Sequence, residues 1–437
     1  MAKKKQDLTP EERLAAALVP KEEWPYALPD GWNWVRIGAL NDYKSSSITP
    51  STNPDDTFEL YSVPSIVNDY PEITKGMDIG STKQLVEKDD VLLCKINPRI
   101  NRVWKVSAHT SHKCLASSEW IVVRARSFFA SDYLMWFFRC PYFRERMLSN
   151  VSGVGGSLMR AKPRYVQTYP VALPPLSEQR RLVARIESLF AKLDAAREKV
   201  QSVLDSHETR KAALLHAAFA RKLTAKWREE QGESSHAWRI EKLENLCEKI
   251  TCGKTPKNDI SPQGEIPYLK VYNIVNDKID FRSKPQYISR DVHETKLKSS
   301  ILKPNDVIMN IVGPPLRKIA IIPDTYPEWN MNQAIVRFRP KEGLDYHFLY
   351  YTLLNPETLD DVVQRTKGVV GQANISITQS RNLKIKVPPL PEQQEIVRIL
   401  GRLLAREQRA RQAAEETLTA IDRMKQSILA RAFRGEL

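Results

Sequence analysis

The chain has 437 residues, which favours two to four domains, and its 27% charged and 42% hydrophobic residues exclude a disordered protein. No apolar run approaches the roughly 20 residues that span a bilayer, and the five cysteines contain no Cys-x-x-Cys pair. We therefore expect reduced thiols in a cytoplasm, with no membrane segment and no zinc site. Its 67 Lys and Arg residues against 52 Asp and Glu give a formal net charge of +15, which indicates a polyanionic partner such as nucleic acid.

The first predicted elements are an extension and a domain. Residues 1–27 lie outside the pattern that follows, which assigns them no role. Residues 28–173 contain short β-type runs, such as those at 91–93 and 120–123, separated by polar turns. The dense aromatic run at 133–138 is typical of a core helix rather than of a base-stacking surface. A segment of this size can bury its own core, so we predict an α+β domain.

A long helix is predicted next, within residues 174–230. It begins after Pro-Pro-Leu, and there is no proline or glycine between Glu178 and Glu230. Apolar residues recur at steps of four and three, the seam of a coiled coil. A helix of about 40 residues would be about 60 Å long, which favours a spacer or docking rod. The seam residues are Leu182, Ile186, Leu189 and Leu193.

The same two elements follow again. Residues 231–387 contain short β-type runs, such as those at 307–309 and 334–336, and a late aromatic run at 346–351. Residues 388–437 predict a second long helix, whose start is weakened by Gly401. The seam residues of the second helix are Ile396, Leu400, Leu403 and Ile421.

The chain is therefore a tandem repeat. Pro-Pro-Leu-Ser-Glu-Gln at 174–179 recurs 214 positions later as Pro-Pro-Leu-Pro-Glu-Gln, and Ala218-Phe219 recurs at the same offset as Ala432-Phe433. Looser landmarks, including Ile-Val-Asn-Asp at 66–69 and 274–277, precede each block, and the residues between them differ. We predict two similar α+β target-reading domains, separated by two long helices that pair as an antiparallel coiled coil.

Basic and amide side chains in the loops are the candidate DNA contacts, because Arg and Asn make bidentate hydrogen bonds with guanine and adenine edges. Any one of these residues is more often a solvated surface residue, so the set carries the prediction. In the first domain the candidates are Lys95, Asn97, Arg99, Asn101 and Arg102. In the second they are Lys254, Thr255, Lys257, Asn258, Arg317, Lys318, Asn330, Asn332, Gln333, Gln372 and Asn374.

The sequence predicts no catalytic, metal or cofactor site. Gly253-Lys254-Thr255 is not a phosphate-binding loop, because the position of its earlier glycine is Glu248. Asn-Pro-Arg-Ile at 97–100 lacks the second proline and the aromatic residue of the amino-methyltransferase motif. The seven histidines do not cluster, and no paired carboxylates stand out.

These features together resemble the specificity subunits of type I restriction–modification enzymes, over nearly the whole chain from Leu28 on. The resemblance is carried by the two Pro-Pro-Leu-x-Glu-Gln runs leading into long helices and by Ala-Phe-Arg-Gly-Glu-Leu at 432–437. Gly-Lys-Thr-Pro at 253–256, followed by Ile-Pro-Tyr-Leu at 266–269, is similar to the opening of a target recognition domain. One departure is Ala-Arg-Lys at 220–222, where the second copy has Arg-Gly-Glu.

The resemblance implies that each target recognition domain reads one half of a split, asymmetric site in double-stranded DNA. The helices would set the number of base pairs between the two halves of the site and would dock two modification subunits, which carry S-adenosylmethionine and methylate adenine. Restriction subunits would add ATP- and magnesium-dependent translocation and cleavage, as a phage defence in a prokaryotic cytoplasm. This chain would bind no cofactor and catalyse nothing.

Two alternatives stay open at this point. The first is a DNA methyltransferase or nuclease with an unrecognised active site, which methyl transfer or cleavage by the purified chain would reveal. The second is a structural coiled-coil adaptor that never touches DNA. The charge of +15 and the divergent loops speak against the adaptor.

Overall fold

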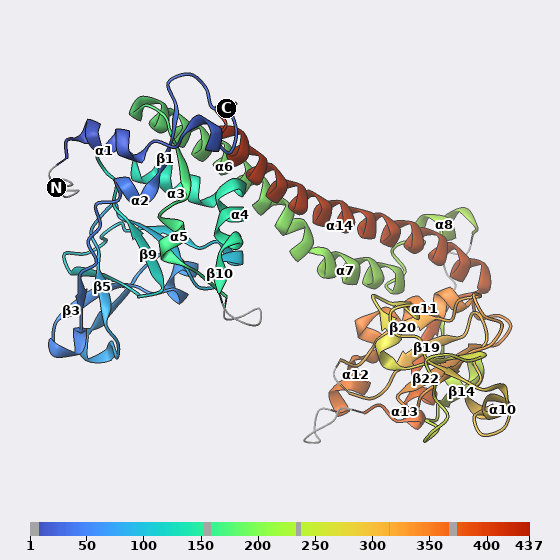
Figure 1. The fold of residues 1–437 in the computed structure, drawn as a ribbon. Helices are drawn as coiled ribbons and strands as arrows, with labels where there is room; N and C mark the ends of the chain where they lie inside the picture. Colours follow the sequence, from blue (N-terminus) through green and yellow to red (C-terminus); the bar gives the residue numbers. More distant parts are fainter. Residues whose placement is uncertain (1–7, 153–158, 233–236, 314, 367–373) are drawn as a thin grey trace. The chain divides into compact units, whose positions relative to one another are not determined.

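Residues 8–152, 159–232, 237–313, 315–366 and 374–437 are described by a computed structural model, in which the chain forms two compact units (Figure 1). Unit 1 comprises the residues up to 201 together with 416–437, and unit 2 comprises residues 202–415. Each unit thus combines one predicted reader with parts of the long helices.

Unit 1 contains a five-stranded sheet of order β2-β5-β8-β3-β4, in which only β3 and β8 are parallel. It also contains an antiparallel sheet of order β7-β6-β9 and the pairs β1-β12 and β10-β11. The strands are β1 (Asn33–Arg36), β2 (Ser47–Ile48), β3 (Thr57–Tyr61), β4 (Glu72–Lys75), β5 (Lys83–Leu85), β6 (Val91–Cys94), β7 (Val103–Lys105), β8 (Lys113–Ala116), β9 (Trp120–Val123), β10 (Val151–Ser152), β11 (Arg160–Ala161) and β12 (Pro170–Leu173). The strands predicted at 91–93 and 120–123 are confirmed as β6 and β9.

The main core of unit 1 lies between the β7-β6-β9 sheet and the helices that follow it. The aromatic run at 133–138 forms most of α3, and Tyr133, Phe137 and Phe138 are buried there, as predicted for a core helix. The shorter helices of this unit are α1 (Pro10–Ala17), α2 (Ile37–Leu40), α3 (Ser131–Arg139), α4 (Pro141–Ser149) and α5 (Pro163–Val166).

The described part of the N-terminal extension packs onto unit 1. Thr9 caps α1, where its hydroxyl accepts a hydrogen bond from the Glu12 N–H and the Glu12 carboxylate accepts one from the Thr9 N–H. Ala17 and Val19 are buried in the core, and the Val19 N–H donates to the Trp34 carbonyl at 2.9 Å. The extension therefore completes the first core.

Unit 2 contains an antiparallel sheet of order β14-β22-β19-β20, a sheet of order β18-β15-β21, and the pairs β13-β23 and β16-β17. The strands are β13 (Arg239–Lys242), β14 (Cys247–Cys252), β15 (Ile266–Leu269), β16 (Ile274–Val275), β17 (Lys278–Ile279), β18 (Tyr287–Ile288), β19 (Val307–Asn310), β20 (Ile319–Ile321), β21 (Asn330–Met331), β22 (Ile335–Pro340) and β23 (Lys384–Val387). The shorter helices are α9 (Leu243–Leu246), α10 (Arg290–Glu294), α11 (Tyr346–Leu354), α12 (Pro356–Thr366) and α13 (Ile377–Arg381). The second aromatic run lies in α11, so the predicted α+β class is confirmed for both readers.

The first long helix is confirmed at about its predicted length, with a bend at Ser206, and it ends before residue 230. It consists of α6 (Leu176–Asp205) and α7 (His207–Phe219), and α8 (Ala225–Glu230) follows after a turn. The Ser206 hydroxyl donates to the Ser202 carbonyl at 2.6 Å, a competing bond that bends helices. Arg221 has φ 66°, and the Lys222 N–H donates to the Ala217 carbonyl at 2.9 Å, which is the bonding of a helix-ending Schellman turn.

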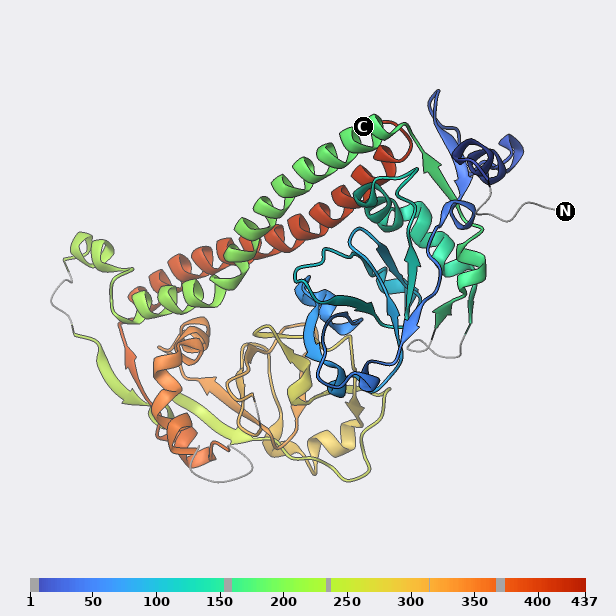
Figure 2. The same ribbon diagram turned by 90° about the vertical axis from the view of Figure 1, so that its left-hand side faces the viewer.

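The second long helix, α14 (Leu390–Ala432), continues through Gly401 without a break and runs antiparallel to the first (Figures 1 and 2). In unit 1, Asp194 pairs with Lys425 and Arg197 with Asp422, so the residue number rises along one helix as it falls along the other. In unit 2, Arg210 pairs with Glu407 at 2.7 Å. The predicted antiparallel pairing is confirmed.

The predicted seam residues have two different environments. Leu182 and Ile186 are buried in the core of unit 1, and Ile396 and Leu400 are buried in that of unit 2, so the start of each helix packs against its own domain. Ile421 is also buried, whereas Leu189, Leu193 and Leu403 are half-buried. Within the ranges that the structure describes, none of the helices combines the length and hydrophobicity that a bilayer crossing requires.

Candidate nucleic-acid interface

The glutamine that ends each Pro-Pro-Leu-x-Glu-Gln run fastens a long helix to the domain before it. Gln179 and Gln393 are both buried, and each side chain makes three hydrogen bonds with the backbone. The bonds are Ala130 N–H to Gln179 Oε1 (2.8 Å), Gln179 Nε2 to Phe128 O (3.0 Å) and to Pro174 O (2.9 Å), and, in unit 2, Asp345 N–H to Gln393 Oε1 (2.9 Å), Gln393 Nε2 to Gly343 O (3.0 Å) and to Pro388 O (3.0 Å). The repeated motif is therefore structural.

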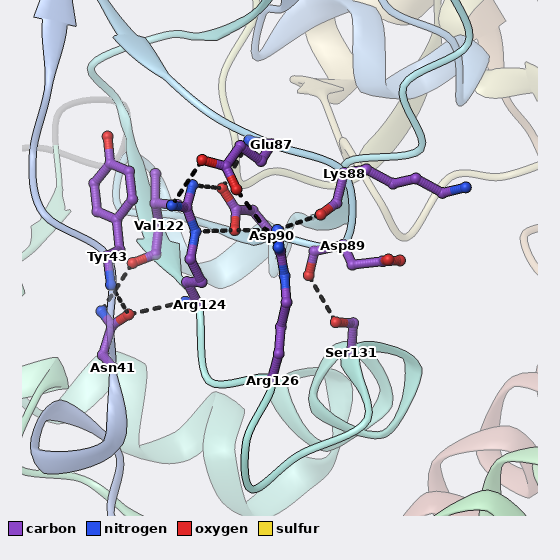
Figure 3. A network of polar contacts seen from close by, with 10 residues as sticks. All are labelled: Asn41, Tyr43, Glu87, Lys88, Asp89, Asp90, Val122, Arg124, Arg126 and Ser131. Carbon is purple, nitrogen blue, oxygen red and sulfur yellow. Dashed lines mark hydrogen bonds and ion pairs between the residues drawn. The ribbon is translucent and has the colours of Figure 1, made fainter.

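A buried aspartate holds the start of an interior strand in each reader, and Figure 3 shows the one in unit 1. Asp90, before β6, accepts two hydrogen bonds of 2.7 Å from the Arg124 guanidinium. Asp306, before β19, accepts the same two bonds of 2.7 Å from Arg339. Each carboxylate raises the pKa of its arginine, because it binds only the charged form. These contacts fix the strand from which the next loop leaves.

The described residues of the loops that follow β6 and β19 share two left-handed backbone positions. In unit 1, residues 95–102 contain left-handed positions at Asn97 (φ 49°) and Asn101 (φ 50°). In unit 2, residues 311–318 contain them at the equivalent Gly313 (φ 89°) and Arg317 (φ 70°), 216 positions later.

The same neighbouring segments hold both loops. The bonds are Lys95 N–H to Glu119 O (3.0 Å) and Ala161 N–H to Lys95 O (2.8 Å), matched by Ile311 N–H to Ala334 O (2.8 Å) and Ile375 N–H to Ile311 O (2.9 Å). One loop framework thus presents different side chains in the two units.

The structure brings the five candidates of the first reader together in this loop. Arg99 is exposed, and Lys95, Asn97, Asn101 and Arg102 are half-buried. The Asn97 Oδ1 atom is buried and has no hydrogen-bond partner among the described residues. Three cations and two amides in eight residues can bind phosphates and base edges.

Three candidates of the second reader belong to the equivalent loop and its neighbouring segment. Arg317 and Lys318 lie in the loop, where Arg317 pairs with Asp360 at 2.6 Å. Asn374 is exposed and forms a β-bridge with Val312 at the loop's edge. Gln372 lies outside the described residues.

A second group of candidates surrounds the turn after β14. A Cβ on Gly253 would lie 2.2 Å from the carbonyl oxygens of Met331 and Asn332, so this turn is pressed against that segment. The Thr255 hydroxyl donates to Gln333 Oε1. The Ala334 carbonyl accepts a hydrogen bond from the Ile311 N–H. The candidates around the turn after β14 therefore adjoin those of the 311–318 loop. A cavity of about 370 Å³ here is lined by Lys254, Thr255, Pro256, Lys257, Asn258, Asp259, Lys296 and Leu297.

Asn330 is not a surface residue and is removed from the candidate set. It is fully buried, and its Nδ2 donates to the Leu297 carbonyl at 3.2 Å and lies 3.1 Å from His293 Nδ1. Its Oδ1 accepts from the Met331 N–H at 2.9 Å. Both ends of the Asn330 side-chain amide are therefore hydrogen-bonded inside the domain. Asn332 stays in the set, because it is half-buried and its Oδ1 has no partner among the described residues.

The described residues contain no cluster of three His, Cys, Asp or Glu side chains that could hold a metal. All five cysteines have free thiols. Burial raises the pKa of Cys140 and of Cys247 to about 12, so both thiols are protonated at neutral pH and poorly reactive. The cations that the motifs missed are Arg160, Lys162 and Arg164, which lie in the segment beside the 95–102 loop.

Known proteins are similar to this chain in sequence and in fold. Residues 236–416 match the family model described as type I restriction modification DNA specificity domain. The chain is 22% identical to the type I restriction enzyme EcoKI specificity subunit of Escherichia coli strain K12, over 81% of this chain and 76% of that protein.

Two solved structures show the same fold. A structure of a type I R-M system, concerned with complex assembly and conformational transition, contains a chain that matches with a TM-score of 0.77 and 22% identity, over 94% of this chain and 100% of that one. The HsdS subunit from Thermoanaerobacter tengcongensis matches with a TM-score of 0.63 and 22% identity, over 95% of this chain and 100% of that one.

Proposed function

We propose that this chain, which belongs to the type I restriction enzyme specificity subunits, is the DNA-binding subunit of a type I restriction–modification complex. Each unit reads one half of a bipartite, asymmetric site in double-stranded DNA. The chain supplies no catalytic step and binds no cofactor of its own. Target recognition domains of residues 28–173 and 231–387, with spacer segments of 174–230 and 388–437, are the working boundaries.

The observation that carries the proposal is the pair of equivalent loops at 95–102 and 311–318. Their backbones share the same left-handed positions and the same anchoring hydrogen bonds. Their side chains differ, since Asn101 of the first loop stands where Arg317 stands in the second. Base pairs differ in the donors and acceptors that they present in the major groove. A fixed loop with exchanged side chains is therefore suited to read two different half-sites.

We further propose that the paired helices set the gap between the half-sites and dock two modification subunits. Support comes from the antiparallel pairing and from the way that each helix start is locked into a domain by its buried glutamine. The modification subunits would carry S-adenosylmethionine, and the restriction subunits would use ATP and magnesium. The complex would work in a prokaryotic cytoplasm.

Methylome sequencing of a host with and without this gene tests the proposal. We expect one split adenine-methylated motif that disappears with the gene. Replacing residues 28–173 by the first reader of another specificity subunit should change one half of that motif only, because the units bury separate cores. An unchanged methylome after deletion contradicts the DNA-reading role, and methyl transfer by the purified chain alone contradicts the non-catalytic role.

A further inference from the structure

The two units carry groups of surface cations at different sequence positions. In unit 1 three cations, the exposed Arg160 and Arg164 and the half-buried Lys162, form what we call the cationic strip, which runs from β11 into α5. In unit 2 two cations, Lys254 and Lys257, form what we call the lysine loop, after β14. Neither set has a charged counterpart at the equivalent positions of the other unit.

The cationic strip runs along the 95–102 loop. Arg160 forms a β-bridge with Ile96, and the next residue donates its N–H to the Lys95 carbonyl at 2.8 Å. The Lys162 and Arg164 head groups lie 5.9 and 4.8 Å from the centroid of the Tyr165 ring, a cation–π arrangement that holds both charges at the surface.

The strip adds net positive charge at this edge. Arg160 pairs with Glu119 at 3.1 Å, but no acidic residue occurs between positions 160 and 169.

The corresponding segment of unit 2 is neutral. Asn374 forms a β-bridge with Val312, and the Ile375 N–H donates to the Ile311 carbonyl at 2.9 Å, so this segment occupies the place of the strip with an offset of 214. At that offset the three cations are replaced by Asn374, Ser376 and Thr378.

The lysine loop shows the reverse pattern. In each unit the first strand after the extension or spacer pairs with the last strand of the reader: β1 with β12, and β13 with β23. The two pairs have the same register, and β13 follows β1 at an offset of 206 residues. At that offset Thr49-Pro50 matches Thr255-Pro256, while Ile48 and Ser51 stand in place of Lys254 and Lys257. The two units thus carry cations at different sequence positions, although the neighbours differ too, since Ile48 pairs with Lys83 of β5 whereas the Lys254 N–H donates to the Met331 carbonyl.

We infer that the two readers hold the DNA backbone with different elements: the cationic strip binds phosphates beside the first half-site, and the lysine loop binds phosphates beside the second. The inference rests on the proposed function and adds to it the residues that position each unit. Arginine and lysine contacts with phosphate fix the register of a protein on DNA but do not themselves specify sequence. Base readout is left to the neighbouring loops.

The test uses the full chain in its assembled complex and a duplex carrying the motif found by methylome sequencing. The strip variant is Arg160→Gln with Lys162→Gln and Arg164→Gln, and the loop variant is Lys254→Gln with Lys257→Gln. Thr378→Ala and Ser51→Ala are the controls at equivalent neutral positions. Circular dichroism and thermal unfolding should show that all variants fold as the parent does.

Affinity for the duplex is measured as a function of salt concentration, because each lost phosphate contact reduces the magnitude of the negative slope of log K against log salt by about 0.9. We expect the magnitude of the slope to fall by roughly two to three for the strip variant and by roughly two for the loop variant. The controls should keep the parent slope. The methylated motif should stay the same in every variant.

Duplexes with uncharged methylphosphonate linkages around one half-site assign each element to its half. Neutralising the first half-site should weaken the parent and the loop variant equally and should weaken the strip variant less, because only the cations of the 95–102 loop remain there. Equal weakening of the strip variant overturns the inference, and so does a changed methylation motif, which would mean that the strip reads bases. A parent complex without sequence preference would instead overturn the proposed function.

Discussion

The two helix starts share a six-residue motif, but its two polar residues behave differently. Gln179 and Gln393 make matching bonds in the two units. The preceding glutamates diverge: Glu178 is 26% exposed and pairs with Arg181 on its own helix, whereas the side chain of Glu392 is only 2% exposed and pairs with Arg228 at 2.7 Å. One sequence motif can therefore contain a contact that is the same in both copies beside a position whose contribution to stability depends on the surrounding chain.

The largest expected effect is at this glutamate. Glu392→Ala should destabilise unit 2 by about 3–5 kcal/mol, because it leaves the buried Arg228 guanidinium without its carboxylate. Thr224 and Trp238 would lose hydrogen bonds to the same carboxylate. Glu178→Ala is the matched control and should cost less than about 1 kcal/mol, as for other exposed pairs. Hydrogen exchange measured on peptides of each unit would separate the two, and equal losses would refute the comparison.

The second effect tests the shared part of the motif. Gln179→Ala and Gln393→Ala should each destabilise their own unit by about 2–3 kcal/mol, since a buried N–H and two carbonyls lose their partner. Urea unfolding with unit-resolved hydrogen exchange gives both values. A difference of more than about 1 kcal/mol between the two variants would show that the anchors are not equivalent.

The third effect concerns how the two long helices end. Gly435, with φ 76°, closes α14 as Arg221 closes α7, but a Cβ at residue 435 would lie 2.1 Å from Pro29 Cγ. Gly435→Ala should therefore destabilise unit 1 by about 2 kcal/mol, from the left-handed backbone and the clash. Arg221→Gly should change stability by less than about 1 kcal/mol, because relief of its backbone offsets the lost contact with Trp238. Thermal unfolding of both variants checks the sign.

Much of the fold was predictable from the sequence, because the tandem repeat indicates the number and order of the domains. The 214-residue offset correctly indicated two related readers with paired helices, and the aromatic runs correctly indicated α3 and α11. The bend at Ser206 was not predictable, because no proline or glycine marks it and the side-chain hydrogen bonds of Ser206 and Arg210 in this turn leave no signal in the sequence pattern. The end at Arg221 was missed because a non-glycine residue takes the left-handed position.

The residue types of the candidate interface were predictable from the sequence, but which of those side chains are buried was not. Arg317 and Lys318 were selected as basic loop residues, yet their equivalence to positions 101 and 102 depends on hydrogen bonds with segments distant in sequence. Asn330 was included by the same rule, although His293 and Leu297, more than 30 positions away, enclose it. The cationic strip was overlooked because Arg160 lies beside residue 96 only through a β-bridge.

The smallest expected change in stability is at Gly401, where the sequences of the two long helices differ. Gly401 of α14 stands at the position equivalent to Glu187 of α6, and α14 stays helical through it. Replacing a helical glycine by alanine gains up to about 1 kcal/mol. Here the new Cβ would lie 3.2 Å from the Tyr351 hydroxyl, the far end of a side chain that can shift by a few tenths of an ångström. Gly401→Ala should therefore stabilise unit 2 by about 0.5 kcal/mol.

The reverse change on the same helix supplies the control for this last prediction. Ala405 is exposed one turn further along α14, so Ala405→Gly should destabilise the helix by about 1 kcal/mol. Both values can be read from urea midpoints at constant m-value. If Gly401→Ala instead destabilises unit 2, the Tyr351 hydroxyl cannot move, and glycine is required there for the packing of α11 against α14 rather than tolerated as a weak helix former.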